Sequence, residues 1–246
     1  MIARLPNTNS EFVKPVVLSA FMGQEKPMTI KTRLLRTSLY AGVLLAILGS
    51  LLANPVFALS FSDIEVGFPD FSEFYTTVQS GDANVLRGVY VANVLAAPVV
   101  QQPGDNAGFV SPSDGVLTQF AMPSQFGNVG LLAHNYLSGK LFFELKIGQE
   151  VRLVYGDGRV ETFVIDRILK YQALQPNSLY SNFQDLGTNQ ILTAEQVFRI
   201  AYTGDRHVTF QTCIAANGIS SWGRIFVSAT PKPVSEVAVI PRFDSR

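Results

Sequence analysis

Residues 208–213 read Val-Thr-Phe-Gln-Thr-Cys and end at Cys213, the one cysteine of the 246-residue chain. Successive side chains of a strand point to opposite faces, so we expect Phe210 on one face and Gln211 with Cys213 on the other. Residues 214–221, Ile-Ala-Ala-Asn-Gly-Ile-Ser-Ser, then predict a loop. The pattern places a thiol at the end of a strand and beside a loop, which suits a reactive nucleophile. The alternative is an inert, buried cysteine that acts as a small hydrophobic residue.

Two further side chains suit the chemistry of a thiol nucleophile. His134 ends the apolar run 130–134 and precedes a loop, and a nearby imidazole can assist a thiolate and protonate a leaving amine. Arg224 begins the last strand-like run, eleven residues after Cys213, and a fixed cation can stabilise an oxyanion. The alternative for His134 is a histidine that is only hydrogen-bonded at a strand end. For Arg224 taken alone, a surface or edge-strand arginine is the ordinary interpretation. His207 lies in a polar turn, and we expect it to be solvated and not catalytic.

From Val85 onward, short β-rich runs alternate with Gly, Pro, Asn and Asp, which is typical of a closed or nearly closed β-barrel. The clearest element is a hairpin, in which residues 151–155 and 160–166 alternate around a turn at 156–158. Thr193 and Gln196 form a capping-box pattern at the start of a helix, and a short helix is possible at 71–78. We expect strands at residues 86–92, 98–101, 129–134, 150–155, 159–171, 207–213 and 224–229.

The N-terminal part of the sequence has the pattern of an export signal. Lys31, Arg33 and Arg36 precede the apolar run 39–53, and Val-Phe-Ala follows at 56–58. The run is shorter than the roughly 20 residues that span a bilayer. Cleavage after Ala58 and retention as a membrane anchor both stay open, as do Met1 and Met28 as the true start. The predicted order is then a tether at 59–84, the folded domain at 85–230 and a tail at 231–246.

Composition limits the possible functions. The chain has 19 Lys and Arg against 19 Asp and Glu, and no basic stripe with interleaved aromatic residues, so nucleic-acid binding has little support. One cysteine excludes an internal disulfide and a zinc site built on paired cysteines, and two histidines supply a metal cluster poorly.

The cysteine stretch also resembles a known family. Thr209-Phe-Gln-Thr-Cys213 is similar to the Thr-Leu-x-Thr-Cys signature of sortases, with Phe210 in place of leucine. His134 and Arg224 occur in the family's order and at strand ends, and residues 139–164 resemble the family's Phe-x-x-Leu, Gly-Asp and strand-pair stretch. The resemblance covers residues 85–229. The departures are Asn135 and Tyr136 after the histidine, Gln149 in place of aspartate, and a long connection at 172–205, where the family borders its substrate groove.

The resemblance implies a mainly β fold, a sortase-type closed eight-stranded barrel with one or two short helices. It implies that Cys213 attacks the Thr carbonyl of a C-terminal sorting motif similar to Leu-Pro-x-Thr-Gly, that His134 protonates the leaving Gly amine, and that Arg224 holds the carbonyl oxygen. Thr209 and Thr212 become candidate substrate-binding residues. The expected partners are sorting-motif proteins, an amine acceptor on a cell-wall precursor or a pilin, and the membrane if the N-terminal segment is retained.

The resemblance further implies a location outside the cytoplasm, either secreted or tethered to the membrane. The chemistry needs no metal or organic cofactor; calcium modulates part of the family, and this sequence does not indicate whether it acts here. Two rival functions remain. Another cell-wall cysteine transpeptidase or peptidase is one, although the Ser-His-Gly-Cys motif of L,D-transpeptidases is absent and papain-like enzymes place the cysteine before the histidine. A non-catalytic, sortase-like binding or scaffold protein is the other.

Overall fold

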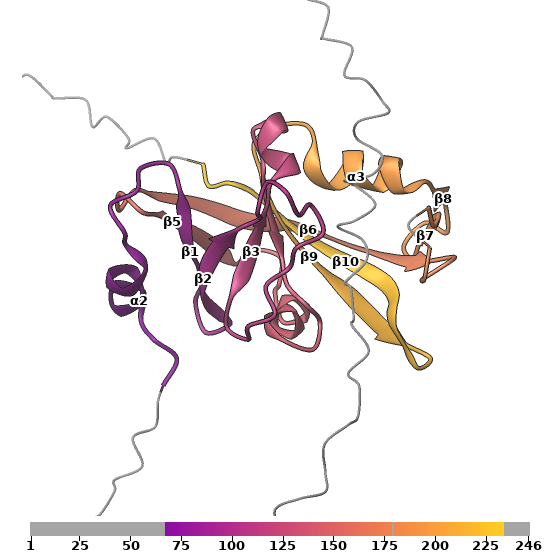
Figure 1. Ribbon diagram of the computed structural model, residues 1–246, viewed down its shortest axis with the longest axis horizontal. Helices are drawn as coiled ribbons and strands as arrows, with labels where there is room; N and C mark the ends of the chain where they lie inside the picture. Colours follow the sequence, from indigo (N-terminus) through magenta and orange to yellow (C-terminus); the bar gives the residue numbers. More distant parts are fainter. Residues whose placement is uncertain (1–66, 179, 234–246) are drawn as a thin grey trace, which may run out of the picture. The chain divides into compact units, whose positions relative to one another are not determined.

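The computed structural model describes residues 67–178 and 180–233, and these form a closed β-barrel with two short α-helices (Figure 1). The predicted signal or anchor segment and most of the predicted C-terminal tail lie outside the described residues. Hydrogen-bonded neighbours follow the order β10-β9-β4-β3-β2-β1-β5-β6, and β6 pairs back with β10. Eight strands therefore close the barrel, which confirms the fold class expected from the sequence. Its strands are β1 (Leu86–Val91), β2 (Leu95–Gln101), β3 (Leu117–Phe120), β4 (Val129–Leu132), β5 (Glu150–Tyr155), β6 (Val160–Ala173), β9 (Val208–Ala216) and β10 (Ile219–Pro231).

Two shorter strands extend the sheet at the far end of β6. They are β7 (Phe183–Asp185) and β8 (Ile191–Leu192), and β7 pairs with residues 171–173 of β6. Helix α3 (Ala194–Tyr202) follows them and crosses the outer face of the barrel (Figure 1). Two 3₁₀ segments, η1 (Met122–Phe126) and η2 (Ser138–Phe143), flank β4.

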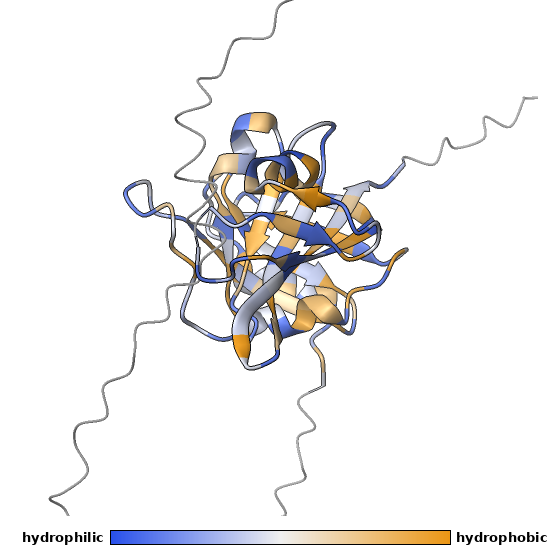
Figure 2. Ribbon diagram, turned by 90° about the vertical axis from the view of Figure 1, so that its right-hand side faces the viewer, coloured by the Kyte–Doolittle hydropathy of each residue, from blue (hydrophilic) through white to orange (hydrophobic). Residues whose placement is uncertain are grey.

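The interior of the barrel is filled by alternate, mostly aliphatic residues. Val208 and Phe210 of β9 point inward, as do Ile225 and Val227 of β10, and all four are buried. Figure 2 shows hydrophobic and hydrophilic segments interspersed along the strands. The intervening residues of β9 and β10 therefore face outward, as the sequence alternation predicted.

A second apolar cluster lies outside the barrel, beneath α3. Val197, Phe198 and Tyr202 of the helix pack on Leu132 and Phe226 from the outer faces of β4 and β10. The helix covers part of this face, so its position decides which outward residues stay accessible.

Helix α2 (Phe71–Val78) is present where the sequence suggested a short helix. Asp70 caps it, since its side chain accepts from the backbone N–H of Glu73. Phe74 is buried and packs towards Gly88 of β1, where a Cβ atom would come within 2.9 Å of its ring. Figure 1 shows α2 beside β1, away from α3.

The sequence was wrong about the segment after Cys213. No loop begins there, because β9 continues to Ala216 and a tight turn at Asn217 and Gly218 leads directly into β10. Both turn residues have positive φ angles of 54° and 76°. An Asn-Gly pair at such angles is the strongest short-range signal of a two-residue hairpin.

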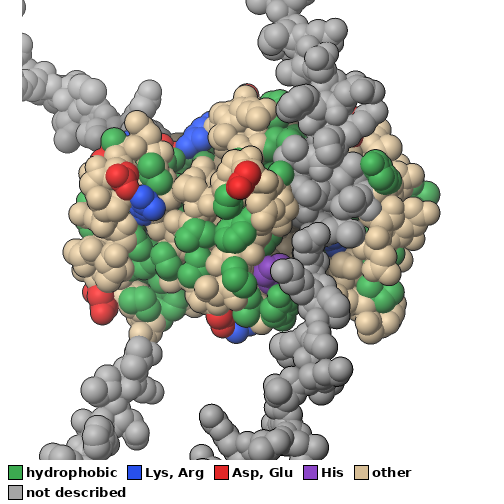
Figure 3. Space-filling view, in the orientation of Figure 1, with side chains coloured by type: hydrophobic (Ala, Val, Ile, Leu, Met, Phe, Trp, Pro, Cys, Tyr) green, Lys and Arg blue, Asp and Glu red, His purple; other side chains and the backbone are tan. Residues whose placement is uncertain are grey.

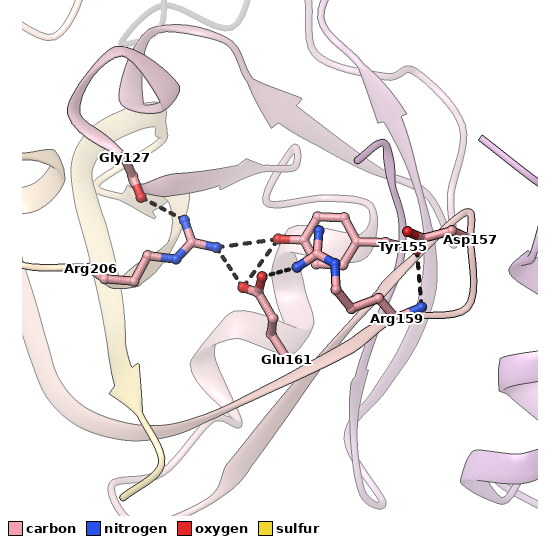
Figure 4. A network of polar contacts seen from close by, with 6 residues as sticks. All are labelled: Gly127, Tyr155, Asp157, Arg159, Glu161 and Arg206. Atoms are coloured by element: carbon pink, nitrogen blue, oxygen red, sulfur yellow. Dashed lines mark hydrogen bonds and ion pairs between the residues drawn. The ribbon is translucent and has the colours of Figure 1, made fainter. Parts of the chain in front are cut away.

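A polar network lies near the start of β9 and links it to the β5–β6 hairpin (Figure 4). Arg206 lies 2.5 Å from Glu161 and donates to the backbone carbonyl of Gly127, also at 2.5 Å. Arg159 also bridges to Glu161, and the Tyr155 hydroxyl donates to it at 3.2 Å. Partial burial acts to raise the pKa of Glu161, but the hydrogen bond and charge of Arg206, with Arg159, outweigh it and leave that pKa lowered.

This lowered pKa makes the network's contribution dependent on pH. A carboxyl group whose pKa is depressed by folding stabilises the native state above its unfolded pKa of about 4.3 and loses that effect as the pH falls through the folded value. We therefore expect Glu161→Gln to lower the urea midpoint at pH 7 and the difference from the parent chain to shrink below about pH 4. An equal difference at pH 7 and pH 3 would contradict this assignment.

The capping box at the start of α3 gives a second test of the fold. Thr193 accepts from the backbone N–H of Gln196, and the Gln196 side chain accepts from the backbone N–H of Thr193. Removing such a cap typically costs about 1 kcal/mol. We expect Thr193→Ala to lower the free energy of unfolding by about this amount in urea titrations, with Thr193→Ser close to the parent chain.

Candidate active site

The candidate site lies on the outer face of the barrel, where three neighbouring chain segments bring one residue each to the same height along the strands, here called a level. Antiparallel pairing sets Arg224 of β10 directly opposite Cys213 of β9, and Phe226 opposite Gln211. Directly opposed residues of two strands point to the same face. Arg224 and Cys213 therefore both point outward from neighbouring strands, whose backbones lie about 4.8 Å apart.

His134 reaches the same level from the other side of β9. Strands β4 and β9 are parallel, with Leu132 level with Gln211. His134 lies two residues beyond Leu132, just as Cys213 lies two residues beyond Gln211. The chain stays beside β9 past the end of β4, because the Thr212 hydroxyl donates to the carbonyl of Ala133 at 2.7 Å. The three residues predicted from the sequence thus belong to adjacent segments at one level.

Helix α3 covers the next two outward-facing positions of β9, Gln211 and Thr209, but leaves the position of Cys213 partly open. The Tyr202 hydroxyl donates to the side chain of Gln211 at 2.5 Å, and the Thr209 hydroxyl donates to the carbonyl of Ala201 at 2.7 Å. Cys213 and His134, by contrast, are half-buried. Solvent or a ligand can reach the thiol and the imidazole, whereas the residues beneath α3 support the helix.

Arg224 is the most enclosed of the three residues, with 2% of its surface exposed. Its Nη1 donates to the backbone carbonyls of Gly223 at 2.8 Å and Ser221 at 3.0 Å. Burial lowers the pKa of the guanidinium, and the negative charge of a Cys213 thiolate acts in the opposite direction. A guanidinium is always charged in proteins, so the site holds a fixed, poorly solvated cation beside the thiol.

An irregularity in the β9–β10 ladder produces the contacts of Arg224. The register shifts between Ile219 and Gly223, where residues 220–222 face fewer residues of β9. Such bulges turn backbone groups out of the ladder and re-aim side chains. Here the carbonyl of Ser221 accepts from Arg224, and the carbonyl of Ser220 accepts from the side chain of Asn135 at 3.1 Å.

The turn that carries His134 is closely packed. Its carbonyl accepts from the backbone N–H groups of Leu137 and Gly139, both at 3.0 Å. Gly139 has no room for a side chain, since a Cβ atom there would lie 2.4 Å from the Thr212 hydroxyl and 2.6 Å from the His134 carbonyl. The backbone of this turn is therefore held from both sides.

The remaining predicted residues have different surroundings. Thr209 and Thr212 are buried, and both hydroxyls donate to backbone carbonyls; their contact with a substrate stays a prediction. The expectation of a solvated His207 was wrong. Its ring is buried, with Nδ1 2.6 Å from the carbonyl of Asp205 and Nε2 2.9 Å from that of Ala201. It precedes β9, and six residues of strand separate it from Cys213 by about 20 Å.

Two supporting residues were missed in the sequence. Gln211 stood out only as one position of the cysteine motif. It lies two residues before Cys213 on a strand, and this spacing already placed both side chains on one face. Asn135 was noted only as a departure from the resembled family, and an asparagine side chain in a turn is a common donor to nearby backbone.

The remaining observations on the described chain concern membrane-crossing helices, metal sites and surface charge. Among residues 67–178 and 180–233, no helix has the length and apolar character needed to cross a membrane. The same residues contain no group of three or more His, Cys, Asp or Glu side chains placed to hold a metal ion. On the face seen in Figure 3, basic and acidic side chains are interspersed.

Comparisons with known proteins find similarity to solved structures. No family model matches the chain, and no curated protein matches it. The solved structures that match include sortase A of Listeria monocytogenes, at 13% identity over 61% of this chain and 88% of the other, with a TM-score of 0.39. Sortase C-1 from Actinomyces oris matches at 11% identity over 70% and 85%, with a TM-score of 0.42. A sortase D5 transpeptidase of Clostridium perfringens matches at 15% identity over 67% and 90%, with a TM-score of 0.37.

These neighbours are sortases of three classes, the family that the sequence resembles. Because the identities are at most 15% and the TM-scores are below 0.5, the roles of individual residues rest on this chain's own geometry.

The packing at Gly139 gives a test of the site's geometry. We expect Gly139→Ala to lower the free energy of unfolding by about 1 to 3 kcal/mol, because the added methyl group meets backbone and a buried hydroxyl that have little room to move. We also expect it to slow alkylation of Cys213, since the His134 turn must shift. Gly104→Ala is the matched control, because a Cβ atom there meets nothing within 4 Å. Equal stability of the two variants would contradict the described packing.

Proposed function

We propose that this protein is a sortase-type cysteine transpeptidase. The observation that carries the proposal is the placement of Arg224, Cys213 and His134 at one level of three adjacent segments, at the edge of the surface covered by α3. A fixed cation, a thiol and an imidazole are the groups that acyl transfer through a thioester requires. The closed eight-stranded barrel supports the same proposal.

The proposed reaction begins with attack on a peptide carbonyl. The Cys213 thiolate adds to the carbonyl carbon of Thr in a C-terminal sorting motif similar to Leu-Pro-x-Thr-Gly. The buried Arg224 guanidinium stabilises the oxyanion, and a charge at this position is effective because little water screens it. As the tetrahedral intermediate collapses, the C–N bond to Gly breaks and His134 gives its proton to the leaving amine.

The second half of the reaction restores the thiol. An amine on a cell-wall precursor or a pilin attacks the thioacyl carbonyl, His134 takes its proton, and the bond to sulfur breaks to release Cys213. His134 thus gives one proton to the leaving amine and takes one from the incoming amine, which returns both side chains to their starting states. No metal or organic cofactor takes part in these steps, and the enzyme would act outside the cytoplasm, secreted or held by its N-terminal segment.

The direct test incubates the full chain, in mild detergent, with peptides that carry Leu-Pro-x-Thr-Gly variants, with and without triglycine. Intact-protein and product mass spectrometry would detect a thioacyl adduct on Cys213 and a new amide with triglycine. Cys213→Ala and His134→Ala should form no transpeptidation product. A folded protein with a reactive Cys213 but no adduct with any peptide would overturn the proposal and favour a scaffold role.

Arg224 offers a sharper prediction. Arg224→Lys keeps a positive charge but loses the planar guanidinium group. In the parent chain, Nη1 of this group donates to two backbone carbonyls while the group lies beside Cys213. We expect kcat/KM to fall about 100- to 1000-fold, the loss usual for one oxyanion donor. Melting temperatures measured in parallel separate this effect from unfolding, and an Arg224→Lys variant with near-parent kcat/KM would remove Arg224 from the proposed mechanism.

A further inference from the structure

The ring of Tyr136 covers one face of the His134 imidazole. The two ring centroids lie 5.2 Å apart and the planes meet at 23°, a stacked arrangement. Tyr136 is 57% exposed, so its ring contributes little to the core. We propose that Tyr136 is a positioning residue that holds the His134 imidazole in the orientation needed beside Cys213. This inference rests on the proposed function and adds a residue to it.

The backbone hydrogen bonds of the turn act on the main chain of His134 and not on its ring. Hydrogen bonds from Leu137 and Gly139 hold the carbonyl of His134, but they do not restrict its side-chain torsions. The second torsion of a histidine has a broad distribution and no strong intrinsic preference. A flat partner against one face of the ring limits this rotation, and Tyr136 supplies that partner.

Tyr136 follows a residue that anchors the turn. Its neighbour Asn135 donates to the carbonyl of Ser220 at 3.1 Å, which joins the turn to the irregular start of β10. The next carbonyl, that of Ser221, accepts from Arg224 at 3.0 Å. The turn that carries the stacked rings and the segment that orients Arg224 are therefore linked through two successive residues.

The attraction between the two stacked rings comes from the aromatic rings themselves, because offset aromatic pairs interact through their faces and edges. The phenolic hydroxyl is not required for it. Phenylalanine at position 136 should therefore keep the orientation of His134, and alanine should lose it. Phe68 provides a matched control, since it is 41% exposed and its ring lies 5.7 Å from that of Tyr90, on the α2 side of the barrel.

The experiment compares the full chain with Tyr136→Ala, Tyr136→Phe, Phe68→Ala and His134→Ala. One readout is the second-order rate of Cys213 alkylation by iodoacetamide between pH 5 and pH 9. The other is the NMR signal of the His134 ring protons, assigned with the His134→Ala variant, because a stacked ring shifts these signals upfield. Melting temperatures confirm that each variant is folded.

We expect Tyr136→Ala to lose the upfield shift and to slow alkylation about 3- to 10-fold. A change of this size corresponds to the loss of one aromatic pair, which lowers the fraction of molecules with His134 in the stacked orientation. Tyr136→Phe should keep both, and Phe68→Ala should match the parent chain. In peptide assays the loss should appear in kcat with KM for the sorting-motif peptide unchanged. An alkylation rate that is unchanged in Tyr136→Ala, although the upfield shift is lost, would overturn the inference.

The alkylation assay needs no peptide substrate, so it separates the two proposals. If the parent chain forms no thioacyl adduct but its alkylation rate depends on Tyr136 as expected, the proposed function fails and the positioning role stands. If transpeptidation occurs and Tyr136→Ala turns over at the parent rate, the function stands and the positioning role fails.

Discussion

The pairing of β10 with β6 is the interaction on which the rest of the structure depends. It joins β10, the last of the described strands, to β6 through residues 223–231, and so turns a linear series of strands into a barrel. Closure buries the inward residues of β10, such as Val227, and leaves the alternate residues, Arg224 among them, facing outward. The site thus exists because the same strand both seals the core and places an enclosed cation on the outer side of the barrel wall.

The three residues of the candidate site differ in burial in a way that suits different tasks. Arg224 is almost fully enclosed and bound to two backbone carbonyls, so its position varies little. Cys213 and His134 are half-buried and lie on the part of the outer face that α3 leaves uncovered. A group that stabilises charge benefits from exclusion of water, whereas groups that exchange covalent bonds and protons need access.

Local chemistry in the sequence predicted the local elements well. The alternation around residues 156–158 predicted the β5–β6 hairpin, and Thr193 with Gln196 predicted the start of α3, because both depend on neighbours in the chain. The alternation of β9 also predicted the faces of Phe210 and Cys213. The Asn217-Gly218 turn was overlooked, although its signal was present. The buried ring of His207 could not have been predicted, because its surroundings depend on where α3 ends in space.

The site as a whole depended on long-range pairing. That His134 lies level with Cys213 follows from the parallel register of β4 and β9, which are separated by 75 residues between Leu132 and Val208. No local pattern specifies such a register. The cysteine motif and its resemblance to a family supplied that information instead, whereas the roles of Asn135 and Tyr136 became visible only in the folded chain.

The topology also affects how the folded protein behaves in a crowded mixture. An open sheet presents unpaired N–H and C=O groups along its outermost strands, and these can recruit strands of other chains. Here eight of the described strands belong to the ring, and the sheet order ends at β8, which is two residues long. The described edge strand β8 is therefore short, and little of its backbone is open to pairing with another chain.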